Sequence, residues 1–487
     1  MITTYFKNKK TAQWCVYLFT GLVIGFLVSL IDTMDSIINN FLIFILFSLC
    51  IAPLISKRKD EEFDVFNTRV FIPLVYFLYF GAGYYFYNFR VNNFSEDIRM
   101  SESSVQTGLL LAIIGIVFFY IGYSLIYKIK KRDKNERDIL AGWKQKKILS
   151  FTVISLFFFT AANALLWLSI RGIPLFIPEY YTESRTEIMA GKGYFYFIVL
   201  AVVPVSLLIT ALYWRTQGIL QAKTSVVLKL LVLAMSSVAL LTLLFNVERG
   251  LFVVFLVFIF INYHYLKRRL NIKKLAVLFL VMILLAALGG YLRSQQWSEN
   301  EWVFAYVFLK EMLPEFDNYI QVIENVPDPL PLQFGRTIIP LFTNPIPRFL
   351  LPDKDNFKTA GIIFKEFFGH TWIRVGERVT LVGELFMNFH IVGVILGMFL
   401  FGAVAAFVQR TLCPSDKNPV KVLLYSLTLM GLISQIAGDI VSATLGYIQL
   451  VLPVLAIIIV IKIGTDMKHL QSREMGSQFD NKSLVKK

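Results

Sequence analysis

The sequence predicts an all-α polytopic membrane protein with about twelve transmembrane helices and one large extracytoplasmic loop. Hydrophobic residues make up 56% of the 487 residues, against about 45 to 50% in soluble domains. Charged residues make up only 17% and gather in short segments between long uncharged runs. Because lipid offers the backbone no hydrogen-bond partner, such runs must be helices. This composition excludes an ordinary soluble enzyme and a disordered chain.

Twelve runs approach the length that crosses a bilayer, about 20 residues for a hydrocarbon core of about 30 Å. The tenth contains Glu384 and the eleventh contains Asp439, so both acids are expected inside the membrane. We therefore expect helices 1 to 9 in residues 1–292, the large loop in 293–378, helices 10 to 12 in 379–463 and a cytoplasmic tail in 464–487. The runs are 14–31, 36–55, 70–89, 105–127, 148–170, 194–214, 230–247, 250–266, 275–292, 379–408, 422–444 and 446–461.

The basic residues predict the orientation of the chain. With both termini in the cytoplasm, the cytoplasmic segments hold 33 of the 48 Lys and Arg and the short outer loops hold 6. Cytoplasmic loops carry such an excess. The remaining 9 lie in segment 293–378 together with 11 acids. That segment is too long to follow the charge rule, and we expect it outside the cytoplasm.

Local patterns predict short amphipathic helices in the large loop. Ser298 and Glu301 form a capping box ahead of a helical apolar pattern. Pro314 suits the first turn of a second helix that ends near Asn325. We expect both helices on or near the membrane surface. The basic run Lys128–Lys147 is juxtamembrane, which favours a topology signal over nucleic-acid binding. No nucleotide motif occurs in the cytoplasmic loops, and we expect no cofactor.

Several arginines lie in the predicted extracytoplasmic segments. A guanidinium presents a fixed fork of donors to phosphate oxygens and stays charged, so it suits a diphosphate. Arg249 is held at membrane level, because it lies in a very short turn between two apolar runs. The other arginines in these segments could instead form salt bridges with neighbouring side chains or contact lipid headgroups. These arginines are Arg185, Arg249, Arg336, Arg348, Arg374 and Arg378.

A polar stripe enters the tenth run. At 100° per residue, Glu377, Glu384 and Asn388 fall on one helix face. A carboxylate in a membrane is costly and usually has a purpose. Three roles stay open for Glu384: general base or substrate ligand, ion-pair partner of an arginine such as Arg249, and transport proton site. Asp439 is a helix-packing partner or a ligand.

His370 is the single histidine predicted outside both the cytoplasm and the bilayer. A histidine can accept a hydroxyl proton near neutral pH, so His370 rivals Glu384 as the base. No HExxH motif or histidine pair occurs, and the acidic pair Asp353 and Asp355 is too common a pattern to indicate metal. We expect no metal site.

Three segments together resemble a known family. They are the turn 246–251, residues 334–354 with their Phe-Gly-Arg-Thr and Pro-Ile-Pro-Arg-Phe motifs, and Gly-Glu-Leu-Phe-Met-Asn-Phe at 383–389. They resemble oligosaccharide repeat-unit polymerases of the Wzy-dependent surface polysaccharide pathway. The family often continues its Glu-x-x-x-Asn-Phe motif with glycine, where this chain has His390.

The resemblance implies a GT-C-like fold and a lipid-linked glycosyltransferase in the bacterial cytoplasmic membrane. The substrate would be an oligosaccharide on undecaprenyl diphosphate within the membrane lipid, and a chain-length regulator would be a further partner. Arg249 and Arg348 would bind diphosphate, with Arg185 and Arg336 as supporting clamps and Glu377 and Asn388 as further ligands. Glu384 or His370 would receive the proton. A glycan ligase and a flippase or ion-coupled transporter remain alternatives.

Overall fold

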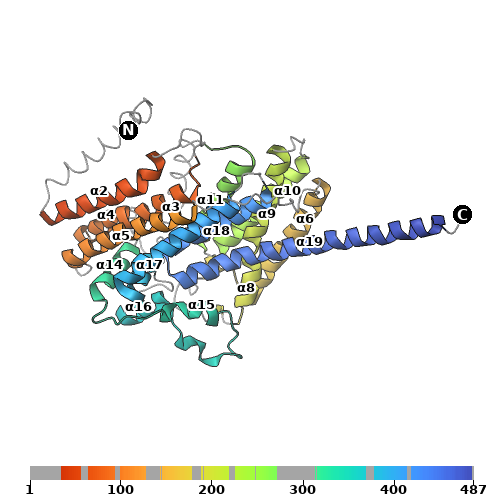
Figure 1. Ribbon diagram of the computed structural model, residues 1–487. Coiled ribbons are helices and arrows are strands. Elements are labelled where there is room, and N and C mark those ends of the chain that lie inside the picture. Colours follow the sequence, from red (N-terminus) through yellow and green to blue (C-terminus); the bar gives the residue numbers. More distant parts are fainter. Residues whose placement is uncertain are drawn as a thin grey trace, which may run out of the picture. The chain divides into compact units, whose positions relative to one another are not determined.

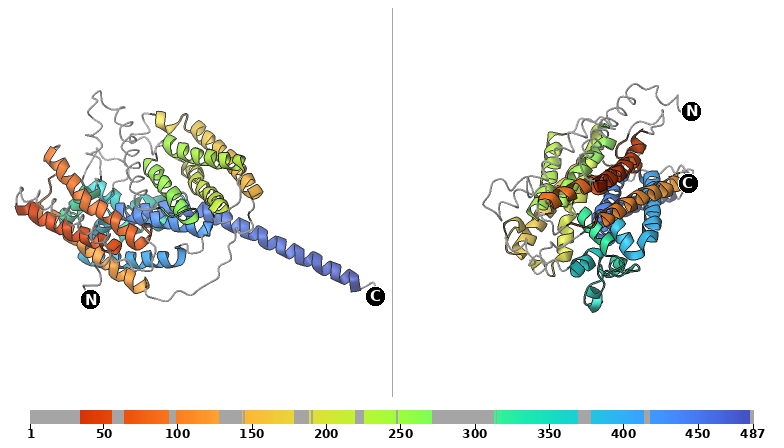
Figure 2. Two further views of the ribbon diagram at one scale, coloured as in Figure 1. Left: turned by 90° about the horizontal axis from the view of Figure 1, so that it is seen from above. Right: turned by 90° about the vertical axis from the view of Figure 1, so that its left-hand side faces the viewer.

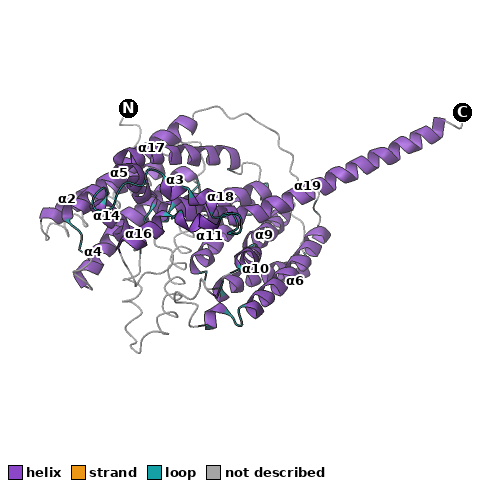
Figure 3. Cartoon of the chain, turned by 90° about the horizontal axis from the view of Figure 1, so that it is seen from below, coloured by secondary structure: helices purple, strands orange, loops and turns teal. Residues whose placement is uncertain are grey.

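The described residues of the computed structural model are helical or irregular, with no strand among them (Figure 3). The structure describes residues 34–55, 64–93, 99–127, 143, 145–177, 188–189, 191–218, 225–246, 248–270, 313, 315–368, 378–413 and 418–484.

The chain divides into two compact units (Figures 1 and 2). The first unit comprises Met1–Lys131, Ile272–Cys413 and Thr428–Leu445, and the second comprises Arg132–Asn271, Pro414–Leu427 and Gly446–Lys487. The first contains α2 (Met34–Ile55), α3 (Thr68–Phe77), η2 (Leu78–Ala82), α4 (Gly83–Asn93), α5 (Glu102–Tyr127), α14 (Glu315–Asn325), η6 (Arg336–Ile338), α15 (Pro340–Thr343), η7 (Pro352–Asn356), α16 (Ala360–Phe368) and α17 (Leu381–Leu412). The second contains α6 (Gln145–Ser169), η4 (Pro174–Phe176), α8 (Gly193–Leu200), α9 (Val202–Gly218), α10 (Val226–Phe245) and α11 (Arg249–Leu266). Parts of α18 (Pro419–Ala437) and α19 (Ile440–Leu484) belong to each.

Eight helical stretches in the described part of the chain are long and apolar enough to cross a membrane. Two shorter apolar helices, Ile37–Pro53 and Val254–Leu266, coincide with further predicted runs. Every predicted run that falls among the described residues is therefore helical over most of its length, which agrees with the polytopic all-helical class. Runs 14–31 and 275–292 lie outside the described residues.

The boundary predicted between the last two runs is wrong. The sequence suggested a turn near residue 445, but α18 ends at Ala437 and α19 begins at Ile440. Asp439 is thus not inside a span but in the turn, where its carboxylate accepts hydrogen bonds from the Ser442 amide at 2.6 Å and hydroxyl at 2.9 Å. An acid at this position satisfies free amides of a helix N-terminus. The uninterrupted apolar pattern on both sides concealed the turn.

The core of the first unit is the packing of α5 against α17. A Cβ at Gly122 would lie 1.9 Å from the Phe399 carbonyl oxygen, and one at Gly402 would lie 2.0 Å from that of Phe119. Only glycine allows the two backbones to come this close, as is common between membrane helices. At one end of this pair, Gln409 accepts a 2.9 Å hydrogen bond from the Thr68 amide. This packing fixes the longer segment of α17, whose other end carries the candidate site.

The helix α14 packs into the first unit, and its place on or near the membrane surface stays a prediction. It ends at Asn325 as expected, and Pro314 lies outside the described residues. Tyr319 is fully buried and donates a 2.7 Å hydrogen bond to the Gly108 carbonyl of α5. Phe316 packs where Gly83 leaves room in α4. The aromatic side chains of α14 therefore pack against helices of the first unit.

Polar contacts also tie the second unit together. Asn163 of α6 donates to the Thr242 hydroxyl of α10 at 2.9 Å, and Trp167 donates to Asn246 at 3.3 Å. The Tyr196 hydroxyl donates to Glu248, which precedes α11, at 2.6 Å. These contacts hold together the short turn between α10 and α11.

Candidate functional site

The predicted tenth span is not one helix, because α17 is broken at Phe389 and His390. Phe389 has φ −139° and ψ 21°, and His390 has φ 54° and ψ −147°. A Cβ at Gly393 would lie 2.2 Å from the Leu385 carbonyl oxygen, and one at Gly397 would lie 2.3 Å from the Leu385 side chain. Residues eight and twelve positions apart touch only if the chain folds back. The segment 381–388 therefore lies against the start of the longer segment 391–412.

The break frees backbone carbonyls, and residues 333–335 satisfy them. The Gln333 amide donates to the Met387 carbonyl at 3.0 Å, and the Phe334 amide donates to the Asn388 carbonyl at 3.1 Å. The Gly335 amide donates to the Asn388 side-chain oxygen at 2.7 Å. Gly335 has φ 84°, a conformation that glycine adopts without strain. Non-helical backbone at membrane depth is tolerated where protein supplies such partners.

Glu384 lies at the centre of a buried polar cluster, here called the Glu384 node and comprising Thr337, Glu384, Asn388 and the Ile440 amide. The Thr337 hydroxyl donates to Glu384 Oε1 at 2.7 Å, and the Ile440 amide donates to Oε2 at 2.5 Å. Asn388 Nδ2 donates to the Thr337 hydroxyl at 2.8 Å and to the Glu384 carbonyl at 2.9 Å. All three side chains are buried. The node joins segments that are distant in the sequence: the loop before α15, α17 and the start of α19.

The node also tests the predicted polar stripe. Glu384 and Asn388 share a helix face, as expected from their spacing. The helix begins at Leu381 after Thr380, whose hydroxyl accepts from the Gly383 amide. The helical face therefore does not extend to Glu377, which itself lies outside the described residues. In the part of the chain that the structure describes, one Glu384 oxygen accepts a hydrogen bond from a hydroxyl and the other accepts one from a backbone amide. Neither oxygen is bonded to an arginine there.

Arg336 lies between two residues that the node fixes. The amide of Gly335 and the hydroxyl of Thr337 both bond to α17. Arg336 itself is exposed, and its guanidinium has no hydrogen-bond or ion-pair partner among the described residues. Two exposed aromatic side chains are close to it. Phe334 lies two positions earlier in the sequence, and the Phe389 ring lies next to Gly335. The arrangement presents an unpaired cation beside apolar side chains, which suits an anionic lipid.

The node contains no further predicted site residue among those that the structure describes. Arg348 is exposed on the segment after α15. Arg249 is the first residue of α11 in the second unit, and its side chain is outside the described part. Arg185, His370 and Glu377 lie outside the described residues. The structure therefore brings together Glu384, Asn388 and the backbone of Arg336.

Sequence reasoning missed Thr337, because no local pattern shows that a threonine 47 positions away bonds to Glu384.

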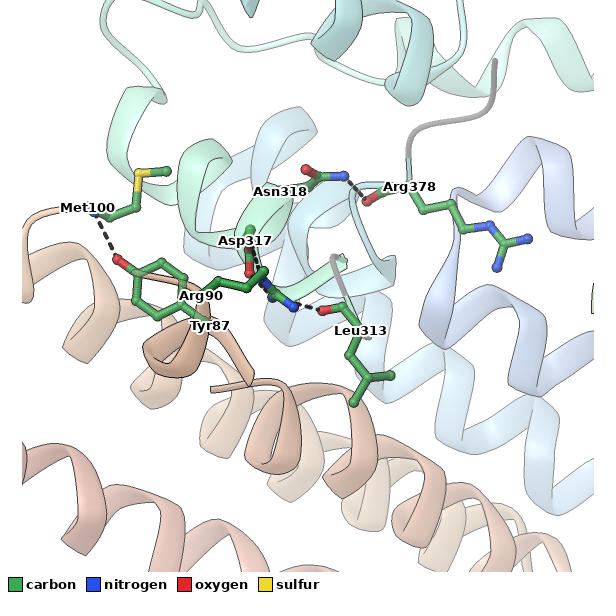
Figure 4. Close-up of polar contacts among 7 residues, drawn as sticks. All are labelled: Tyr87, Arg90, Met100, Leu313, Asp317, Asn318 and Arg378. Carbon is green, nitrogen blue, oxygen red and sulfur yellow. Dashed lines mark hydrogen bonds and ion pairs between the residues drawn. The ribbon is translucent and has the colours of Figure 1, made fainter. Parts of the chain in front are cut away.

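Sequence reasoning also missed the buried ion pair of Arg90 and Asp317 (Figure 4). Arg90 Nε donates to Asp317 Oδ2 at 2.8 Å, and Nη2 donates to Oδ1 of the same carboxylate. Burial raises the pKa of Asp317, and the hydrogen bond from Arg90 opposes that rise. The one available signal was an arginine at the end of an apolar run.

This ion pair fixes α14 to the bundle on the same side as the node. Asn318 of α14 donates to the Arg378 carbonyl at 3.1 Å, just ahead of α17 (Figure 4). The Met100 amide donates to the Tyr87 hydroxyl at 2.8 Å, which joins the residues just before α5 to α4 (Figure 4). Arg378, just ahead of α17, is therefore bonded to α14.

The candidate membrane spans indicate a polytopic membrane protein, and its broken helix α17 carries a buried carboxylate close to an exposed arginine that has no polar partner among the described residues. A family model described as O-antigen polysaccharide polymerase Wzy matches residues 15–468. The chain belongs to this family, whose members are bacterial inner-membrane glycosyltransferases that polymerise lipid-linked oligosaccharide repeat units. Searches of curated proteins and of solved structures find no match.

Proposed function

We propose that the chain polymerises undecaprenyl-diphosphate-linked repeat units at the outer face of the cytoplasmic membrane. The observation that carries this proposal is Arg336: an unpaired, exposed guanidinium whose flanking residues are fixed by α17. A fixed cation can stabilise a developing charge with little reorganisation. Exposed Phe334 and Phe389 offer apolar surface to the first units of a lipid tail.

In the proposed reaction, a sugar hydroxyl of a new lipid-linked unit attacks the anomeric carbon of the growing chain. The bond from that carbon to the diphosphate oxygen breaks as the new glycosidic bond forms. Lipid diphosphate leaves with the electron pair, and the hydroxyl proton passes to a base. Arg336 and Arg348 bind the departing diphosphate in this scheme, assisted by Arg249 and Arg185.

We assign Glu384 and His370 different roles. Both Glu384 oxygens already accept hydrogen bonds and the side chain is fully buried, which favours a positioning residue over a proton acceptor. Its bonds to Thr337 and Ile440 fix the backbone next to Arg336. His370 is then the proposed proton acceptor, on the strength of its chemistry and predicted side. Asn388 shares the positioning role, and Glu377 is proposed as a ligand of the acceptor sugar.

The proposed topology has twelve transmembrane helices, cytoplasmic termini and an extracytoplasmic segment 293–378. Contacts within the first unit support it. The node, the pair Arg90 and Asp317, and the bond from Ser101 to Glu324 join ends that this topology assigns to the outer side. The bonds from Thr68 to Gln409 and from Arg410 to Ile126 join ends assigned to the cytoplasm. A chain-length-regulating protein is a further proposed partner, which co-purification would test.

The test is the product formed by purified protein in proteoliposomes supplied with a lipid-linked repeat unit. A ladder of repeat units on undecaprenyl diphosphate is the expected product. Transfer of one finished chain to a different acceptor would indicate a ligase instead. Movement of the lipid-linked unit across the bilayer without any new glycosidic bond would indicate a transporter.

A further inference from the structure

The segment 334–350 exposes an unusual amount of apolar surface. Phe342 is 72% exposed and Phe349 is 80% exposed. Apolar area in water costs about 25 cal/mol per Å², and contiguous patches of it usually mark a membrane or protein contact. The exposed apolar side chains of the segment are Phe334, Ile339, Phe342, Ile346, Phe349 and Leu350.

The charges of the segment are all of one sign. It contains Arg336 and Arg348 and no acidic residue. Arginine and aromatic side chains together are typical of segments that lie in the interface, with rings among acyl chains and cations among phosphates. Two copies of such a surface would repel each other, because like charges would be brought together. Charge therefore favours a membrane over a second copy as the partner.

One end of this apolar surface lies next to an exposed apolar stripe on α17. Residues spaced three or four apart along the longer segment of α17 are exposed, so they form one stripe that faces lipid in a membrane. At the break this stripe reaches Phe389, which is also exposed. A Cβ at Gly335 would lie 3.5 Å from the Phe389 ring. The stripe consists of Val392, Leu396, Leu400, Val404 and Phe407.

A lysine side chain binds two backbone carbonyls of the segment. Lys354 Nζ donates to the Asn344 carbonyl at 3.2 Å and to the Ile346 carbonyl at 2.8 Å. The chain around α15 projects away from the other helices of the first unit (Figures 1 and 2). Each carbonyl that is bonded within the chain lowers the cost of placing such a projection at the edge of a bilayer.

We propose that residues 334–350 form an interfacial anchor, with Phe342 and Phe349 inserted among the acyl chains of the adjacent leaflet. Arg336 and Arg348 then lie at the level of the lipid phosphates. The anchor goes beyond the proposed polymerisation and does not depend on which glycan reaction the chain performs. It would hold the node at a fixed depth relative to the lipid phosphates.

Site-directed spin labelling of the full chain tests the anchor in vesicles of phosphatidylethanolamine and phosphatidylglycerol. Cys15, Cys50 and Cys413 are replaced by alanine, and a nitroxide is attached to Phe349→Cys or, separately, to Phe342→Cys. Asn356→Cys is the matched control, because Asn356 is exposed and polar in the same loop. Collision rates with oxygen, which concentrates in lipid, and with a water-soluble nickel complex give the environment of each label.

The anchor predicts that oxygen collisions exceed nickel collisions at positions 342 and 349 and that the order reverses at position 356. A label at position 349 that is as accessible to nickel as the control would overturn it. Shielding from both reagents would also overturn it, because protein and not lipid would then cover the segment. The Phe342→Cys variant repeats the test if Phe349→Cys alters folding.

Discussion

The Glu384 carboxylate of α17 accepts a hydrogen bond of 2.5 Å from the backbone amide of Ile440, the first residue of α19. A carboxylate at a helix N-terminus is favourable, since free amides and the helix dipole both attract it. The same carboxylate binds the Thr337 hydroxyl beside Arg336. The start of α19 and the backbone of the proposed phosphate ligand are therefore coupled through one side chain.

Replacing Thr337 by valine should destabilise the protein and lower polymer formation. The change leaves Glu384 Oε1 and Asn388 Nδ2 without the hydroxyl that joins them. A buried polar group without a partner costs about 1 to 3 kcal/mol. Thermal unfolding in detergent measures the loss, and Thr337→Ser, which keeps the hydroxyl, is the control. Equal melting temperatures for the valine and serine variants would contradict the role of the node.

Replacing Arg336 by alanine should lower polymer formation at unchanged protein level and unchanged stability. The guanidinium has no partner among the described residues, so its loss disturbs no contact within them. Loss of a hydrogen bond to a charged group corresponds to a decrease of about 10- to 100-fold in rate. Lys358→Ala is the control, because it removes a charge from a surface ion pair in the same loop. Full activity of Arg336→Ala would exclude the assignment.

Breaking the ion pair of Arg90 and Asp317 should detach α14. Both side chains are buried, and removing one partner of a buried pair costs about 3 to 5 kcal/mol. Arg90→Met and Asp317→Leu alone should each lower the melting temperature. The double variant should recover part of the loss, because no unpaired charge remains. Additive losses in the double variant would show that the two residues do not act as a pair.

The tight turn in α17 should not accept an alanine at Gly393. The added methyl group would meet the Leu385 carbonyl oxygen at 2.2 Å, so the segment 381–388 would have to move. Overpacking of this kind costs about 1 to 3 kcal/mol. Gly446→Ala is the matched control, because nothing lies within 4 Å of a Cβ there. The Gly393 variant should melt at a lower temperature and the control should not; equal behaviour would mean that α17 does not fold back.

We also expect polymer formation to continue after divalent cations are removed. The sequence has no HExxH motif or histidine pair, and the proposed arginines can themselves neutralise the diphosphate. The ladder assay with and without a chelator measures this. Loss of the ladder in chelator and its return with added magnesium would assign the charge stabilisation to a metal.

The helices could be predicted from the sequence, because a long apolar run in lipid must satisfy its backbone hydrogen bonds internally. It did not reveal the break at Phe389 and His390, since neither a proline nor a charge interrupts the apolar pattern there. Gly393 and Gly397 indicated a close approach, but glycine is common in membrane helices. The break depends on residues 333–335, which local patterns cannot place.

Local spacing predicted part of the candidate site, but not the contacts between distant segments. The spacing of Glu384 and Asn388 predicted that they share a face, and their contacts confirm it. Their bond partners Thr337 and Ile440 are 47 and 56 positions from Glu384, so no spacing rule could find them. Asp439 could have been recognised as a cap, because Ser442 follows three residues later and Gly438 precedes it.

The central claim is that Arg336 receives the lipid diphosphate, and the most direct test is an experimental structure with undecaprenyl diphosphate bound. We predict diphosphate oxygens within about 3 Å of the Arg336 guanidinium, with the first prenyl units against Phe334 and Phe389. A diphosphate bound elsewhere, with Arg336 still facing solvent, would contradict this account.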